Sequence, residues 1–419
     1  MSDRKITSVS IVGGGPSGSC LAILLLRAGV RVRIYTIPKR PELIVGESLI
    51  PAVITILRRL GVEGEVASMG RIKPGASLFL KESPVWAKRG IGVGGFRWNL
   101  DFGIAEPNLP GYAYNIPRGE FDEFILNKAK NNGAEIIYSR ASFMQGSNGE
   151  IFIQGESSPS EIVVDATGRS RALCRMLGLP SRKGDRDDRA IFSHYDYAET
   201  PDGGNIHLDI LDNGWSWRIP LRDRVSIGIV APRDYFEKWD CSVEEQFDRA
   251  IIGEIPLVKA LSGKGKRIAG VGKYSNYQWR SDIMYGSNWA LVGDAAGFVD
   301  PAFSSGVFLS LRSAELLADT IIERGVTGFS DYDATVKDLI SNWQLVVDSF
   351  YDNSFFNMIR LGKLLKNEKS FDSSRVEKTL FKIVSGFATS EDYKMFKLFL
   401  AFSNRSEFEK DLESVNSGY

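Results

Sequence analysis

The stretch ITSVSIVGGGPSGSCLAILLLRAGVRVRIYT, residues 6–36, decides the fold. Its apolar pattern predicts a buried strand, a glycine-rich turn, a helix and a second strand. Gly13, Gly15 and Gly18 have the GxGxxG spacing, in which glycines permit a tight turn, a close approach of the backbone to a pyrophosphate and close packing of helix on strand. The free N–H groups at the start of that helix suit a diphosphate. The stretch therefore predicts a Rossmann-like dinucleotide-binding domain of the α/β class.

The residue at the end of the second strand departs from the usual pattern. An acidic side chain commonly stands there and binds the ribose hydroxyls, whereas this chain has Thr36. A threonine hydroxyl makes a hydrogen bond but no charge-assisted one. We expect a modest affinity for the cofactor, with Glu42 or Glu47 as possible replacements for the missing carboxylate.

Composition excludes several classes of protein. Of the 419 residues, 43% are hydrophobic, and Lys plus Arg equals Asp plus Glu at 52 each. This balance argues against a nucleic-acid binder or a protein of the membrane surface. Three scattered cysteines and two histidines, interpreted as structural, argue against a disulfide framework, a metal site and a Ser-His-Asp triad. Without a signal-peptide core or a membrane-spanning run, we expect a cytoplasmic protein.

Three later segments follow the glycine-rich stretch in a fixed order. Residues 114–136 join a Pro-Arg pair, containing Arg118, to a helix. Residues 161–171 form a buried strand that ends in a turn of small residues, and residues 288–321 form a strand, a Gly-Asp turn, a loop and a long helix. This order resembles the FAD-binding fold of the p-hydroxybenzoate-hydroxylase type. The resemblance implies that Arg118 belongs to the cofactor site and that Asp294 contacts the ribitol chain of FAD.

The rest of the chain predicts a sheet and a helical tail. Alternating apolar and polar residues with turn signals predict an antiparallel, substrate-binding sheet. Four aromatic residues in its first part either line a pocket or belong to the core: Trp86, Phe96, Trp98 and Phe102. We expect a discontinuous FAD-binding domain over residues 1–75, 111–178 and 276–325. The sheet domain is expected over residues 76–110 and 179–275, and a C-terminal helical region over residues 326–419.

Four short motifs go beyond this framework: GES, K-x-G-A, W-x-W-x-I-P and D-P-x-x-S-x-G. Each has a structural explanation when taken alone. Two tryptophans on one strand face can be core residues, Ser48 can cap a helix that starts near Pro51, and a lysine beside Pro-Gly is usually solvated. The residues concerned are Gly46, Glu47, Ser48, Lys73, Trp215, Trp217, Ile219, Pro220, Asp300, Pro301, Ser304, Ser305 and Gly306.

Together and in this order, the motifs resemble those of the flavin-dependent halogenase family. The resemblance implies that reduced FAD, oxygen and chloride or bromide yield hypohalous acid, which moves through an enclosed passage to the substrate. It implies a catalytic Lys73 that holds or carries the halogen, and a halide bound by the backbone N–H groups of Ser305 and Gly306. The implied cofactor-binding residues are Gly13, Gly15, Gly18, Gly46, Glu47, Ser48, Arg118, Asp294, Pro301 and Gly306. The implied passage residues are Trp215, Trp217, Ile219, Pro220 and Phe303.

Phe303 narrows the resemblance to one branch of the family. Tryptophan halogenases have a glutamate at this place, so the chain resembles the phenol and pyrrole branch. An electron-rich phenol, pyrrole or indole is then the expected substrate, possibly tethered to a carrier protein or peptide. Because no separate nicotinamide-binding domain is visible in the sequence, we expect a separate flavin reductase to supply the reduced cofactor.

Two other functions fit the same residues. One is an FAD-dependent monooxygenase that hydroxylates an aromatic substrate, including a protein tryptophan during quinone-cofactor biogenesis. The other is a flavin-binding scaffold without turnover, which the weakened ribose position at Thr36 slightly favours.

Overall fold

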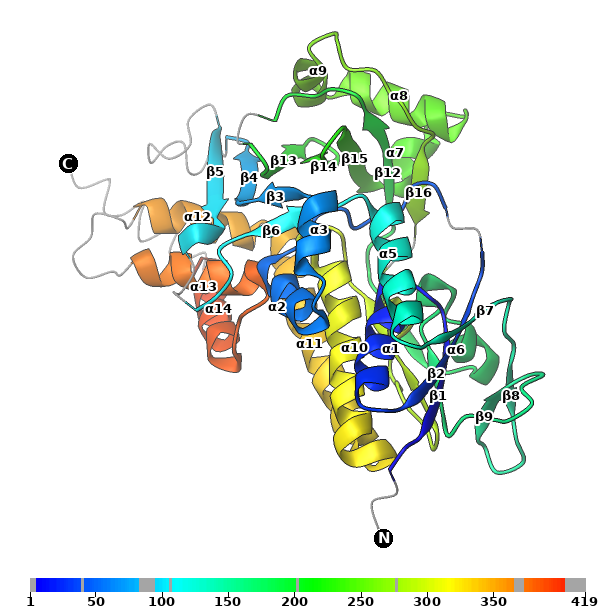
Figure 1. The fold of residues 1–419 in the computed structure, drawn as a ribbon. Helices are drawn as coiled ribbons and strands as arrows, with labels where there is room; N and C mark the ends of the chain where they lie inside the picture. Colours follow the sequence, from blue (N-terminus) through cyan, green and yellow to red (C-terminus); the bar gives the residue numbers. More distant parts are fainter. Residues whose placement is uncertain are drawn as a thin grey trace, which may run out of the picture.

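The computed structural model describes residues 5–38, 41–82, 95–104, 108–200, 203–275, 278–364 and 373–403. Within these ranges the chain forms two main sheets with helices packed beside them, and a helical C-terminal region (Figure 1). Trp86, one of the four aromatic residues singled out above, lies outside the described residues.

The first sheet is the predicted Rossmann-like unit. Its five strands are all parallel and are ordered β18, β10, β1, β2, β7, with bounds Trp289–Leu291, Ile162–Asp165, Ser8–Val12, Arg31–Thr36 and Glu135–Tyr138. Helix α1, Pro16–Arg27, starts directly after the glycine-rich turn. A Cβ atom on Gly18 would lie 2.0 Å from the carbonyl oxygen of Gly13. A glycine is therefore needed at position 18 for α1 to pack this closely on β1.

The second sheet supplies the predicted substrate-binding layer. Its strands run in the order β16, β12, β15, β14, β13, β4, β5, with bounds Gly272–Ser275, Asp188–Tyr195, Val225–Pro232, Gly214–Pro220, Ile206–Leu211, Gly75–Leu80 and Phe96–Asp101. All neighbours are antiparallel except β13 and β4, which are parallel. The expectation of a wholly antiparallel sheet is therefore wrong at one pair, because β4 comes from a distant segment of the chain and joins the edge of the β12–β15 meander.

The two faces of this sheet have different neighbours. Side chains such as Ile191, Ile227 and Ile229 form a separate core with three helices, α7, α8 and α9, over Arg233–Glu237, Val243–Gly253 and Ile255–Leu261. The opposite face carries Phe192 and Trp217, which belong to the main core together with the Rossmann-like unit. Because side chains alternate along a strand, Trp215 and Trp217 point to this second, inner face.

Three smaller sheets in the described part of the chain accompany the two main ones. Strands β3 and β6, Arg71–Lys73 and Ala113–Asn115, pair with each other, as do β8 and β9, Phe143–Gln145 and Ile151–Ile153. Strand β11, Ser181–Lys183, pairs with β17, Trp279–Ser281, which also pairs with β19, Gly297–Phe298. We expected residues 179–275 to belong to the substrate-binding sheet. Strand β11 instead belongs to this small sheet with β17 and β19, which lie before and after β18 in the chain.

The helical elements give the remaining framework. Four further helices in the described ranges precede the C-terminal part and lie outside the second sheet's helical layer: α2, α3, α5 and α6, over Pro51–Leu60, Glu63–Met69, Arg118–Asn131 and Ala172–Leu177. The C-terminal part begins with the long α10 and α11, which run side by side (Figure 1), and continues with α12, α13 and α14. Their bounds are Ser305–Arg324, Phe329–Tyr351, Ser354–Leu364, Ser373–Ser385 and Ser390–Ser403. Among the described helices, none combines the length and apolarity that a bilayer crossing requires.

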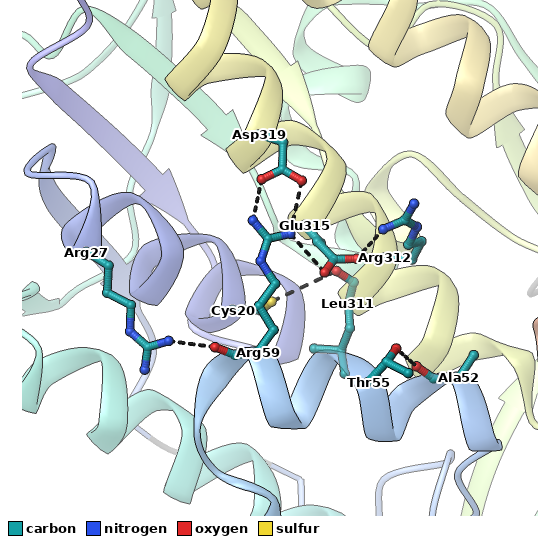
Figure 2. Close-up of polar contacts among 9 residues, drawn as sticks. All are labelled: Cys20, Arg27, Ala52, Thr55, Arg59, Leu311, Arg312, Glu315 and Asp319. Atoms are coloured by element: carbon teal, nitrogen blue, oxygen red, sulfur yellow. Dashed lines mark hydrogen bonds and ion pairs between the residues drawn. The ribbon is translucent and has the colours of Figure 1, made fainter. Parts of the chain in front are cut away.

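An ion-pair cluster joins α2 to α10. Arg59 of α2 lies 2.9 Å from the carboxylate of Glu315 and also binds Asp319, both on α10, while Arg27 of α1 donates to the carbonyl oxygen of Arg59 at 2.7 Å (Figure 2). Helix α2 directly follows the GES motif and α10 begins within the D-P-x-x-S-x-G motif. The cluster thus ties α10, which begins inside one motif, to α2, which begins shortly after another.

The inner face of the second sheet leaves no room for a side chain at Gly228. A Cβ atom there would lie 2.2 Å from the ring of Trp217. We expect Gly228→Ala to lower the free energy of unfolding by about 1–3 kcal/mol, because the indole must shift. Urea unfolding measures this, with Gly64→Ala as the control, since a Cβ atom at Gly64 of α3 meets nothing within 4 Å. Equal stabilities of the two variants would contradict the packing described.

Candidate active site

A large cavity lies where the two main sheets meet. Its volume is about 680 Å³, and residues at the ends of β1 and β2, on the inner faces of β12, β13 and β14, and in the loop before α10 line it. Nine of the ten predicted cofactor-binding residues are on its wall: Gly13, Gly15, Gly46, Glu47, Ser48, Arg118, Asp294, Pro301 and Gly306. Gly18 is not, because it packs against Gly13.

Arg118 shapes one wall of this cavity. Its guanidinium binds both carboxylate oxygens of Asp122, at 2.9 and 3.1 Å, and donates to the carbonyl oxygen of Val45. Gly46 has φ = +101°, and a Cβ atom there would lie 2.5 Å from Nη1 of Arg118. The glycine of the GES motif is therefore required both by the backbone and by the close guanidinium. Burial raises the pKa of Asp294 to about 6, while the charge of Arg118 opposes this rise.

Thr36 ends β2 and lines the cavity, as the sequence indicates for the ribose position. Neither suggested replacement is free to take that role. Glu42 is exposed and is not part of the wall. Glu47 lines the cavity, but its Oε1 lies 2.7 Å from Nε2 of His194, and both side chains are buried. The pairing of Glu47 with His194, contributed by β12, has no signal in the sequence.

The loop before α10 has the features of an anion site. The backbone N–H of Ala302 donates to Asp300 at 2.9 Å, and Ser304 takes the left-handed conformation with φ = +58°. Helix α10 then starts at Ser305, whose side chain is 1% exposed and whose Oγ is a buried atom without a hydrogen-bond partner among the described residues. Free N–H groups at such a helix start favour negative charge. With the glycine-rich turn and the cavity size, this unpartnered hydroxyl fits FAD and a halide.

Lys73 is almost completely buried. It ends β3, its side chain is 1% exposed, and its Nζ donates to Oγ of Ser48 and to the carbonyl oxygen of Leu49, both at 2.8 Å. The ring centroid of Phe102 is 5.3 Å from Nζ. In the described part of the chain, no carboxylate forms an ion pair with this amine. Burial lowers the pKa of Lys73 to about 7, so the amine and the ammonium form coexist near neutral pH.

This geometry also settles two alternatives for the motifs. Lys73 is not a solvated loop lysine, since it is buried. Ser48 does not cap α2, whose N-cap residue is Ile50 and has no side-chain cap. Its hydroxyl instead accepts the hydrogen bond from Lys73.

A second, much smaller cavity lies beside Lys73. Its volume is about 30 Å³, which is room for one or two water molecules. Lys73 is the charged residue on its wall, and Trp98 and Phe102 are there as the sequence suggested. The other lining residues are Ile50, Ala76, Leu78, Leu100, Ile206, Leu208, Ala302, Phe303, Phe355 and Val384.

The residues that line both cavities differ from those predicted. Trp215, Trp217 and Ile219 line the large cavity alone, and Phe303 lines the small one. Pro220 is on neither wall, and its carbonyl oxygen accepts a hydrogen bond from Asn115 at 3.1 Å. The shared wall consists of Ile206, Leu208 and Ala302.

Sequence reasoning missed this shared wall. The sequence IHLDIL, residues 206–211, could have indicated it, because Ile206 and Leu208 alternate with polar residues there. They belong to β13, which pairs with β14, the strand of Trp215 and Trp217. The place of Ala302 follows from its hydrogen bond to Asp300, which the sequence does not reveal.

The fold and this site define a flavoprotein in which a buried lysine lies at a second cavity beside the cofactor cavity. Comparisons with known proteins agree with this class. The model of the tryptophan halogenase family matches residues 106–355, more than half of the chain, and an FAD binding domain model matches residues 6–150. The chain therefore belongs to the tryptophan halogenase family, and it is an FAD-dependent enzyme.

Individual relatives extend the match over most of the chain. A 1H-pyrrole-2-carbonyl-[peptidyl-carrier protein] chlorinase of Pseudomonas fluorescens is 29% identical over 84% of this chain and 84% of its own. A tryptophan 2-halogenase of Chondromyces crocatus is 30% identical over 83% of this chain and 68% of its own. The solved flavin-dependent brominase Bmp2 has the same fold, with a TM-score of 0.78 and 20% identity over 97% of this chain and all of its own.

The lowered pKa of Lys73 predicts a pH dependence of stability. The unfolded chain keeps the lysine proton up to about pH 10.5, whereas the folded chain loses it near pH 7. Between these values the unfolded state binds more protons, so the free energy of unfolding rises with pH. We expect the wild type to gain up to about 4 kcal/mol relative to Lys73→Met between pH 7 and pH 10.

Denaturant unfolding of both proteins at a series of pH values measures this difference. Other groups titrate in the same range, and the comparison with Lys73→Met cancels them. A constant difference from pH 7 to pH 10 would show that the ammonium form is not destabilised in the folded protein.

Proposed function

We propose that this enzyme halogenates an electron-rich aromatic ring with reduced FAD, oxygen and chloride or bromide, and that Lys73 is its catalytic residue. The observation that carries the proposal is the buried amine of Lys73, which faces a second cavity separated from the cofactor cavity by Ile206, Leu208 and Ala302. A group so placed is suited to receive a small reactive species from one cavity and present it in the other.

The large cavity would hold FAD through residues of three motifs. Gly13 and Gly15 leave space for the pyrophosphate at the start of α1, and Arg118 and Asp294 provide charges on the wall. When bound and reduced, FAD supplies the electrons with which oxygen turns halide into an electrophilic halogen. The backbone N–H groups of Ser305 and Gly306 would hold the halide, because they begin α10 and are free of intrahelical partners.

Lys73 can serve the transferred halogen in either protonation state. Its ammonium form can donate a hydrogen bond to hypohalous acid, and its neutral amine can bind the halogen directly. A pKa of about 7 keeps both forms available. Ser48 Oγ and the Leu49 carbonyl oxygen fix Nζ at 2.8 Å each, which directs the group toward the small cavity.

The small cavity indicates the character of the substrate. Its wall is apolar and aromatic apart from Lys73, and this suits the flat face of a phenol, pyrrole or indole. Its volume of about 30 Å³ is smaller than any of these rings, so the wall must open when substrate binds. The likeness to a chlorinase of carrier-bound pyrrole supports a substrate tethered to a carrier protein or peptide. We propose a separate flavin reductase as the source of reduced FAD.

The role of Lys73 can be tested with bromide. Purified enzyme, reduced FAD, oxygen and bromide are mixed with a panel of phenols, pyrroles and indoles, free or carrier-bound, and products are examined by mass spectrometry for the bromine isotope doublet. We expect Lys73→Met to lower the rate of bromination roughly a hundredfold or more, while oxidation of reduced FAD continues. Lys128→Met, which removes a partly exposed lysine bound to Glu65, is the matched control.

Three outcomes would count against the proposal. Bromination retained in Lys73→Met removes the lysine from its role. Hydroxylated product without halogen in the wild type indicates the monooxygenase alternative. A protein that binds FAD in neither redox state contradicts the cofactor site itself.

A further inference from the structure

A chain of hydrogen bonds links β14, the strand that carries Trp215 and Trp217, to the loop before α10. The indole Nε1 of Trp215 donates to the hydroxyl of Tyr351 at 3.0 Å. That hydroxyl donates to the carboxylate of Asp300, with its oxygen 3.1 Å from Oδ2. A tyrosine hydroxyl has one proton and accepts as well, so this single group serves both neighbours. The three residues come from β14, the end of α11 and the first position of the D-P-x-x-S-x-G motif.

Asp300 is the acceptor on which the loop depends. It is fully buried and also accepts from the backbone N–H of Ala302 at 2.9 Å and from the amide of Gln278 at 3.3 Å. The bond to Ala302 matters because Ala302 lines both cavities. Holding Asp300 in place therefore also holds part of the wall between the cavities and the strained turn at Ser304.

Tyr351 is itself held from a second side. The guanidinium of Arg186 lies 3.6 Å from its ring centroid, and Nη2 of Arg186 donates to Asp188 of β12 at 3.0 Å. Burial holds the pKa of Tyr351 well above its usual value, so its hydroxyl keeps the proton that it donates. The neighbouring Phe350 contacts Trp215 and Phe303, with ring centroids 5.8 and 5.5 Å apart.

We propose that Tyr351 is a positioning residue that couples Trp215, on the wall of the large cavity, to the loop that begins at Asp300, so that halogen formed in one cavity reaches the other without loss. The proposal rests on the halogenase function proposed above. Without the hydroxyl, Trp215 and Asp300 lose their common partner, and the two parts of the wall move independently. The reactive halogen then escapes to water, while oxidation of the cofactor continues.

Asp300 gives this coupling a pH dependence. Burial raises its pKa to about 7, the carboxylate of Asp188 adds to this rise, and the hydrogen bonds from Ala302, Tyr351 and Gln278 oppose it. Arg186 is the cation that faces both Tyr351 and Asp300. The ionised carboxylate accepts more hydrogen bonds than the protonated form. The link from Trp215 through Tyr351 to Asp300 should therefore become stronger as pH increases through 7. Because the hydrogen bond from Tyr351 lowers the pKa of Asp300, removing the tyrosine hydroxyl should move the midpoint of this pH dependence to higher pH.

Tyr351→Phe tests the proposal, and Tyr332→Phe is its matched control. Tyr332 lies on the same helix, is 2% exposed, donates one hydrogen bond to the carbonyl oxygen of Leu291 at 2.6 Å and lines neither cavity. The measured quantity is brominated product formed per reduced FAD consumed, between about pH 6 and pH 8. We expect Tyr351→Phe to lower this ratio about twofold to tenfold, with its pH midpoint raised. Tyr332→Phe should leave the ratio and its midpoint unchanged, even if it lowers the melting temperature.

A second measurement needs neither cofactor nor turnover. Acrylamide quenching of tryptophan fluorescence in the FAD-free protein, with and without Trp215→Phe, isolates the signal of Trp215, which is 2% exposed in the wild type. We expect quenching of Trp215 to increase in Tyr351→Phe and to stay at the wild-type level in Tyr332→Phe. If Tyr351→Phe does not fold, the bromination ratio of Trp215→Phe tests the same link from its other end, with the same expected fall.

The outcomes separate the two claims. A wild type that brominates no arene contradicts the proposed function, and the quenching comparison still tests the link. Equal ratios in Tyr351→Phe and the wild type, or unchanged quenching of Trp215, overturn the positioning role.

Discussion

The burial of one amino group is the constraint on which the site depends. An ammonium group loses much of its hydration energy when it is buried without a counter-charge, and Lys73 has only a serine hydroxyl and a backbone carbonyl as hydrogen-bond acceptors among the described residues. Ser48 is the last residue of the GES motif and Leu49 follows it before α2 begins, and β3 itself pairs with β6. Burying this amine therefore lowers the stability of the fold, and it lets the amine lose its proton near neutral pH. Such shifted pKa values are common at functional sites.

The inner face of the second sheet divides the space around that amine. Alternation along β13 and β14 directs Ile206, Leu208, Trp215 and Trp217 to the same side, where they meet the Rossmann-like unit. The large cavity is accordingly bounded by the glycine-rich turn after β1 at one end and by bulky rings at the other. The small cavity lies farther along the same face, over β4 and β5, beyond Ile206, Leu208 and Ala302. Separation of two cavities by aliphatic side chains excludes water from the route between them, which is what a reactive halogen requires.

The sequence predicted the parts of this arrangement that local physics determines. The strand, turn and helix over residues 6–36 follow from glycine conformations and apolar periodicity, and the structure confirms them together with the helical C-terminal part. Motif order placed nine of the ten expected cofactor-binding residues on one cavity wall. Parallel pairing of β13 with β4, the transfer of β11 to another sheet and the contacts of Glu47 with His194 and of Tyr351 with Asp300 were not predictable. Each joins segments far apart in the chain and depends on tertiary packing that leaves no local pattern.

A crystal structure of the enzyme with FAD and bromide, with the halide located by its anomalous scattering, tests the central claim most directly. The account expects FAD in the large cavity, a bromide peak beside the backbone N–H groups of Ser305 and Gly306, and Lys73 on the far side of Ile206, Leu208 and Ala302. FAD bound elsewhere, or bromide and Lys73 in direct contact within one undivided cavity, would contradict it.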